Sequence, residues 1–374
     1  MKHLSLLIAG GVMTALVPAC VYPGEAPPKP KPQRYEFAQR SMGVEFRILI
    51  YSLDPERARL AARRAFQRIQ ALDDALSNYK PDSELMRLCR LAEPGLPIPV
   101  SEDLFRVLAI SKRLHRLSNG AFEISVGPLT QLWRRSRKLH RLPKSEILAA
   151  AKKRVGSEWI RLDHARHTVE FLKRGILLDP GGIAKGYAVD QALLSLEKNG
   201  IHSALVDGSG DIAASDPPPD LPGWKIAISP SGDRVRTWVY LAHGAIATSG
   251  DLYGRVILGG KRYSHIVDPK TGLGLVDSKA VTVFHPSCTY ADGLATALSV
   301  LSPGKGMALI RKLGKAGAIL DLGPKGLLQE PADLGLLPYI QKIPVETISP
   351  GKDPSSQNGK EKGPPKRGKS PEGD

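Results

Sequence analysis

Residues 178–188 read LDPGGIAKGYA, which is typical of a strand end followed by a glycine turn and the start of a helix. Gly181 and Gly182 allow the backbone to approach a ligand closely, and the free N–H groups of a helix N-terminus attract anions. Lys185 adds a positive charge to the same turn. The stretch is compatible with a phosphate site, although a lone glycine pair is better explained by an ordinary turn with a solvated lysine.

The sequence around this turn predicts an α+β fold with a mostly antiparallel sheet, because helices and strands do not alternate regularly. Helices are expected from Pro55, from Ser101 to Asn119, from Ile183 to Lys198 and from Tyr290 to Leu301. Strands are expected at Val44–Tyr51, Trp159–Leu162, Thr168–Leu172, Ile176–Asp179, Ala204–Val206, Trp224–Ile228, Val235–Leu241, Ala245–Thr248, Arg262–Val267 and Ala280–Phe284. Neither a Walker loop nor a Rossmann glycine fingerprint is present.

Both ends of the chain differ in composition from its middle. Lys2 and His3 precede an apolar run that ends at Val17-Pro18-Ala19-Cys20, and this run is shorter than the roughly 20 residues that a membrane span needs. We expect a signal peptide at 1–19 and a lipidated Cys20; an ordinary signal peptide with an incidental cysteine is the alternative. Residues 20–34 then form a proline-rich linker, residues 35–348 one folded domain, and residues 349–374 a disordered tail.

The net charge of +16 makes the chain strongly basic, which suits anionic nucleotides and anionic lipid headgroups. The densest basic run lacks interleaved aromatic residues, so we expect a solvated face and no nucleic-acid partner; it comprises Arg134, Arg135, Arg137, Lys138, His140, Arg141 and Lys144. Cys89 and Cys288 have no metal-ligand spacing, which excludes a zinc site and leaves their pairing open.

Two further segments carry candidate chemistry. Residues 290–298, YADGLATAL, place Asp292 and Thr296 on one helix face, where a carboxylate and a hydroxyl offer the hard oxygens that Mg²⁺ prefers. An acid completing an N-terminal turn and a threonine bonding to a backbone carbonyl explain the same spacing equally well. Residues 263–272, YSHIVDPKTG, place His265 before a turn, where it could accept a hydroxyl proton, although a lone histidine in a strand is more often a core residue.

Five blocks in a fixed order make the chain resemble the FAD:protein FMN transferases of the ApbE family, from Arg40 to about Leu313. The blocks are Ser41–Gly43, Ser77–Leu85, Gly120–Leu129, Asp179–Ala188 and Ala247–Thr296. The resemblance implies a single compact unit with an ApbE-like, T-fold-like architecture. It also implies Mg²⁺ as a cofactor and FAD as a substrate.

The roles of individual residues follow from the resemblance. The metal site is implied to consist of the Gly182 carbonyl and the side chains of Asp292 and Thr296, with His265 and Asp292 as catalytic residues. The FAD-contacting set is implied to be Met42, Tyr79, Ala121, Phe122, Glu123, Asp179, Lys185, His265 and Ile266. Two residues depart from the family pattern, since Glu123 replaces a more usual aspartate and Pro180 lacks a backbone N–H.

The resemblance implies Mg²⁺-dependent transfer of FMN from FAD to a threonine or serine hydroxyl of an acceptor protein, through a phosphoester bond and with release of AMP. The acceptor is expected to be a subunit of a redox complex. The enzyme is expected to face the periplasm of a bacterial cell envelope as a membrane-anchored lipoprotein. An FAD pyrophosphatase that releases FMN and AMP, and a non-catalytic flavin-binding lipoprotein, are the alternatives.

Overall fold

A computed structural model describes residues 30–229, 235, 237–250, 255–276 and 279–342. The signal peptide expected at 1–19, the lipidation site Cys20 and the tail expected at 349–374 lie outside the described residues. Described residues from Pro32 onward belong to one compact unit. None of the helices in the described part of the chain is long and apolar enough to cross a membrane.

An eight-stranded sheet forms the centre of this unit, and all of its neighbouring strands pair antiparallel. Its strand order is β1 (Gln33–Ser41), β2 (Val44–Ser52), β6 (Ala204–Asp207), β7 (Asp211–Ala214), β10 (Gly244–Ser249), β13 (Ala280–His285), β14 (Gly317–Asp321) and β15 (Leu327–Glu330). The register pairs Ala247 of β10 with Asp211 of β7 and with Val283 of β13. The middle of the sheet therefore brings together segments that are far apart in the sequence.

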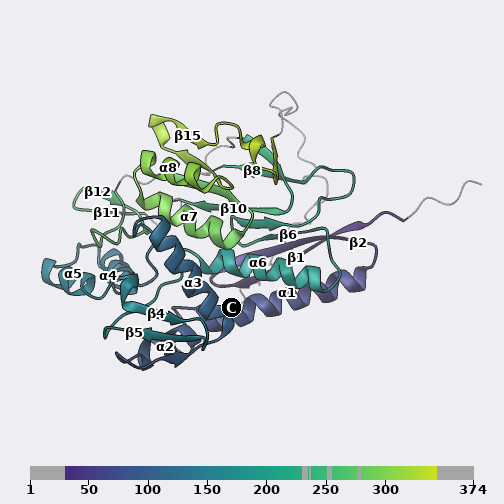
Figure 1. The fold of residues 1–374 in the computed structure, drawn as a ribbon. Helices are drawn as coiled ribbons and strands as arrows, with labels where there is room; N and C mark the ends of the chain where they lie inside the picture. Colours follow the sequence, from purple (N-terminus) through teal and green to yellow (C-terminus); the bar gives the residue numbers. More distant parts are fainter. Residues whose placement is uncertain (1–29, 230–234, 236, 251–254, 277–278, 343–374) are drawn as a thin grey trace, which may run out of the picture. The chain divides into compact units, whose positions relative to one another are not determined.

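Helices pack against one face of this sheet (Figure 1). They are α1 (Pro55–Leu76), α3 (Glu102–Leu117), α6 (Ala184–Lys198), α7 (Cys288–Val300) and α8 (Pro303–Leu313). Helix α1 begins where predicted, because the Asp54 side chain accepts hydrogen bonds from the N–H groups of Glu56 and Arg57. Helix α6 contacts both α1 and α7, so it occupies the middle of the helical layer.

A three-stranded sheet of β8 (Trp224–Ile228), β9 (Thr237–Leu241) and β16 (Ile340–Lys342) packs on the other face of the large sheet. The alternation of β10 shows this two-sided burial: Ala245 and Ala247 contact the helical core, while Ile246 contacts the small sheet. Both faces of the central strands are therefore buried, as their apolar sequence requires.

The remaining elements lie around the large sheet and its helices. They are α2 (Glu84–Leu91), β3 (Ile98–Pro99), α4 (Gly127–Lys138), α5 (Ser145–Lys152), β4 (Ile160–Asp163), β5 (Thr168–Phe171), β11 (Val256–Leu258), β12 (Lys261–Tyr263) and the 3₁₀ helices η1 (Ser157–Trp159), η2 (Gly323–Lys325) and η3 (Leu334–Leu336). Cys89 and Cys288 are free thiols, so they do not pair.

The structure confirms the α+β class and the mostly antiparallel sheet, and corrects three predicted elements. Residues 176–179 are not a strand, because their backbone pairs with a loop: the Gly127 N–H donates to Leu177 O at 3.1 Å and the Asp179 N–H donates to Ile124 O at 2.8 Å. The strand expected to Val267 ends at Tyr263, where the chain bends. Helix α7 begins at Cys288, two residues before the predicted start, so Asp292 lies inside it.

Candidate functional site

Close packing of α6 against α7 brings the predicted metal-binding residues together. A Cβ atom on Gly182 would lie 2.6 Å from Thr296 Oγ1, and one on Gly186 would lie 2.4 Å from the Cys288 carbonyl oxygen. Any larger residue at these two positions would push the helices apart. The glycines therefore serve helix packing at least as directly as ligand approach.

Asp190 on α6 fixes the first turn of α7, and the sequence analysis did not identify it. Its Oδ1 accepts from the Cys288 N–H at 2.8 Å. Its Oδ2 accepts from the Thr289 N–H at 2.9 Å, the Thr289 hydroxyl at 2.6 Å and the Ser287 hydroxyl at 2.7 Å. An acid from another helix thus supplies the cap of α7. The sequence offers one indirect signal for this contact: the first turn of α7 contains no acidic residue that could cap it.

A buried cluster of two acids and one lysine lies between these helices and β7. Asp292 is 4% exposed and accepts one hydrogen bond, from the Gly186 N–H at 3.1 Å. Burial, and then the nearby Asp211 carboxylate, raise the pKa of Asp292 to about 7. Lys185 forms an ion pair with Asp211, and although burial opposes it, the two carboxylates raise the pKa of Lys185. One lysine cannot neutralise both acids, so a cation would be stabilised here.

The residues present fit Mg²⁺. The carboxylate of Asp292 and the hydroxyl of Thr296 are hard oxygen ligands that line the same cavity as Gly182. Among the described residues, no three His, Cys, Asp or Glu side chains converge as metal ligands. A metal at this site would therefore depend on one acid, one hydroxyl and one backbone carbonyl, with water and substrate phosphates completing its coordination.

Most of the predicted ligand-binding residues line one cavity of about 410 Å³. These are Tyr79, Ala121, Phe122, Glu123, Asp179, Gly182, Lys185, His265, Ile266, Asp292 and Thr296. Met42 does not line it and lies in the turn between β1 and β2, with a positive φ of 49°. His265 is exposed at the cavity and follows β12 in a bend.

Two arginines of the basic run also line this cavity, which corrects the prediction of a solvated face for the whole run. The Arg134 guanidinium lies 3.1 Å from Asp179 Oδ2 and 4.5 Å from the centre of the Tyr79 ring. Asp179 Oδ2 also accepts from the Thr130 hydroxyl at 2.6 Å. Helix α4 thus places Arg134 and Arg137 beside a cavity that would accept an anion.

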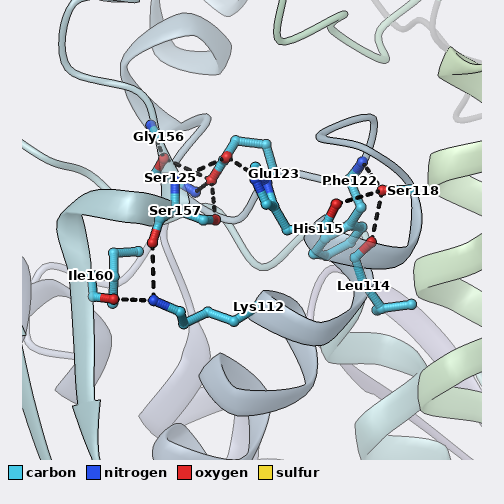
Figure 2. Close-up of polar contacts among 10 residues, drawn as sticks. All are labelled: Lys112, Leu114, His115, Ser118, Phe122, Glu123, Ser125, Gly156, Ser157 and Ile160. Carbon is cyan, nitrogen blue, oxygen red and sulfur yellow. Dashed lines mark hydrogen bonds and ion pairs between the residues drawn. The ribbon is translucent and has the colours of Figure 1, made fainter.

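Glu123 is nearly buried, and partners within the protein occupy its carboxylate (Figure 2). Oε1 accepts from the Ser125 N–H, the Ser125 hydroxyl and the Ser157 hydroxyl at 2.7 to 2.9 Å. Oε2 accepts from the Ser157 N–H at 3.1 Å and lies 2.9 Å from His115 Nδ1. Burial alone would raise the pKa of Glu123, but these partners lower it to about 2. The Glu123 carboxylate therefore binds other residues of the protein, and its contacts do not point to a ligand in the cavity.

The fold and this cavity together define an α+β protein in which basic side chains line the same cavity as a buried acid and a hydroxyl. The sequence model of the ApbE family matches residues 42–320, and the chain belongs to this family. The match covers most of the described domain, including every residue of the cavity.

Relatives and solved structures agree with this assignment. The FAD:protein FMN transferase of Klebsiella pneumoniae is 32% identical over 286 residues, which cover 74% of this chain and 81% of that protein. The flavinyl transferase ApbE of Pseudomonas stutzeri superposes with a TM-score of 0.70 at 30% identity, covering 80% of this chain and 94% of that one. The flavin transferase ApbE of Vibrio cholerae gives a TM-score of 0.70 at 28% identity, covering 80% and 96%.

Proposed function

We propose that this chain is a Mg²⁺-dependent FAD:protein FMN transferase that attaches FMN to a threonine or serine hydroxyl of an acceptor protein and releases AMP. The observation that carries the proposal is the meeting of Lys185, Asp292 and Thr296 in one cavity with the aromatic and small residues expected to contact flavin. Membership of the ApbE family and the names of the relatives support it.

The reaction is a phosphoryl transfer to an alcohol. The acceptor oxygen attacks the phosphorus on the FMN side of the pyrophosphate, a phosphoester bond forms, the bond to the AMP phosphate breaks, and the hydroxyl proton passes to a base. His265 is exposed at the cavity and is the proposed proton acceptor. Lys185 and the N-terminal turn of α6 stabilise the charge that develops on the departing AMP.

Asp292, Thr296 and the Gly182 carbonyl would hold Mg²⁺, which supplies charge neutralisation at the pyrophosphate. The side chains of Tyr79, Phe122 and Ile266 would contact the flavin from the cavity walls. Glu123 contributes through its backbone, because protein donors occupy its carboxylate.

The proposed location is the periplasmic face of a bacterial membrane, with Cys20 lipidated after removal of residues 1–19. A redox-complex subunit in that compartment is the proposed acceptor. Fatty-acid labelling that persists in a Cys20→Ser variant would contradict the anchor.

The test is incubation of the purified chain with FAD, MgCl₂ and candidate acceptor proteins. Covalent flavin on an acceptor, seen by in-gel fluorescence and intact mass, is the expected result. Asp292→Ala should abolish Mg²⁺-dependent labelling, whereas Asp74→Ala, at an exposed acid paired with Lys80, should retain it. Release of free FMN and AMP without labelling would indicate a pyrophosphatase, and intact FAD would indicate a binding protein. Unchanged labelling by Asp292→Ala would contradict the metal assignment.

A further inference from the structure

Ala121, Phe122 and Glu123 form one wall of the cavity, and a polar network surrounds the Glu123 carboxylate (Figure 2). Its centre is the Glu123 carboxylate, which three separate segments of the chain contact: α3 through His115, the 123–125 turn through Ser125, and η1 through Ser157. The proposed chemistry uses none of these contacts. These contacts connect residues 121–123 of the cavity wall to α3 and η1.

The backbone of the wall is also fixed directly. The Phe122 N–H donates to the Ser118 hydroxyl at 2.9 Å, and that hydroxyl donates to the Leu114 carbonyl of α3 at 2.7 Å. The Gly156 N–H donates to the Ser125 hydroxyl at 2.7 Å. The wall is therefore connected to α3 on one side and to the segment before η1 on the other.

Helix α3 makes a second contact with η1 through Lys112. Its ammonium group donates to the carbonyl of Ser157 at 3.1 Å and to that of Ile160. Ser157 thus binds α3 through its carbonyl and Glu123 through its N–H and hydroxyl. Among the partners of Glu123, His115 is the one that carries a positive charge when protonated, and the carboxylate raises the pKa of His115.

A buried carboxylate is stabilised by its partners, and loss of His115 leaves the Ser157 N–H as the one partner of Glu123 Oε2 among the described residues. Because Glu123 is itself part of the cavity wall, we expect a new position of its carboxylate to shift the backbone of residues 121–123. Loss of His115 would therefore change the shape of the flavin pocket without removing any group that contacts the ligand.

We propose that His115 is a positioning residue for flavin binding, which holds the 121–123 wall in its binding conformation through the buried Glu123 carboxylate. This rests on the proposed function for the identity of the ligand. Ser125 and Ser157 bind the same carboxylate from the two other segments. We call His115, Glu123, Ser125 and Ser157 together the brace.

The test compares His115→Leu with His115→Asn in the full chain. Leucine removes the imidazole nitrogen that lies 2.9 Å from Glu123 Oε2, while the asparagine amide nitrogen lies near the place of Nδ1 and can donate to that oxygen. His115→Leu should weaken FAD binding about tenfold in a fluorescence titration, about 1.4 kcal/mol, and raise KM for FAD with kcat changed less than about twofold. His115→Asn should recover most of the affinity.

His167→Leu is the matched control. His167 Nδ1 lies 3.0 Å from a carboxylate oxygen of Glu102, but the pair is exposed and outside the cavity. This variant should bind FAD like the wild type.

Amide hydrogen exchange gives a readout that does not depend on FAD. His115→Leu should speed exchange at the amides of Phe122, Ser125 and Ser157, which donate within the brace. Wild-type affinity for FAD in a folded His115→Leu protein would overturn the proposal, as would equal loss in His167→Leu. Failure of the wild type itself to bind FAD would overturn the proposed function, and the exchange result would still show whether the brace exists.

Discussion

Asp190 offers a direct test of how α7, the helix that carries the proposed metal ligands Asp292 and Thr296, is held. Its carboxylate accepts four hydrogen bonds from Ser287, Cys288 and Thr289, so Asp190→Asn keeps the size of the side chain but loses the charge and one acceptor oxygen. Whichever way the amide is turned, its NH₂ group faces at least one N–H donor. The first turn of α7 then loses part of its cap.

The magnitude follows from the number and kind of bonds lost. A hydrogen bond to a charged group contributes about 1.5–3 kcal/mol, and a helix cap contributes about 0.5–2 kcal/mol. Because the bonds act as a unit and do not add, we expect Asp190→Asn to lower the free energy of unfolding by about 3 kcal/mol. For a domain of this size, that corresponds to a fall in Tm of roughly 5 °C.

Differential scanning calorimetry measures the stability, and the Mg²⁺ dependence of flavinylation reports on the position of Asp292. The matched control is Asp74→Asn, whose carboxylate is 61% exposed and 2.7 Å from Lys80, and which should change the free energy of unfolding by less than about 1 kcal/mol. A Tm for Asp190→Asn within about 1 °C of the wild type would refute the argument that Asp190 caps α7.

Two other substitutions test the site. The folded-state pKa of Glu123, about 2, lies below its ordinary value of 4.5, so this group stabilises the protein above pH 4.5 and the contribution is lost as the pH falls towards 2. Glu123→Gln should remove about 3 kcal/mol of the change in unfolding free energy between neutral and acid pH. The free energy is measured by urea unfolding at several pH values, and an equal pH dependence in the variant and the wild type would contradict this. Gly182→Ala places a methyl group 2.6 Å from Thr296 Oγ1 and should displace this hydroxyl and weaken Mg²⁺ binding measured by calorimetry, so wild-type affinity would contradict the role of Thr296 as a metal ligand.

Local signals predicted α1, α3, α6 and α7, because capping depends on neighbouring residues, but α2, α4, α5 and α8 were not predicted. Asp54 and Ser101 cap α1 and α3 as expected, and Asn119 and Gly120 after α3 adopt positive φ angles. Residues 176–179 were predicted wrongly because an apolar run bounded by turn residues has the composition of a strand, while its actual partner is a loop about fifty residues away.

The candidate site was partly predictable because several of its residues lie in short sequence motifs. Eleven of the twelve residues predicted to bind FAD or metal line one cavity, and Met42 falls outside it. Spacing alone left the role of each motif open, and only their resemblance to one family joined them into a set. Asp190 and Arg134 were missed because their partners lie 98 and 45 residues away in the sequence. No local pattern marks a side chain whose role is to contact a distant element.

By itself, the sequence determined where α1 and α3 begin, where α3 and α6 end, and the residue types available for binding a phosphate and a cation, since all of these depend on neighbours within a few positions. Only the tertiary structure decided which acids share a site, because the packing of α6 against α7 and β7 sets the distances among Lys185, Asp211 and Asp292. It also decided that the Glu123 carboxylate faces partners within the protein. Electrostatic and hydrogen-bond energies depend on distance in space, which separation along the chain does not specify.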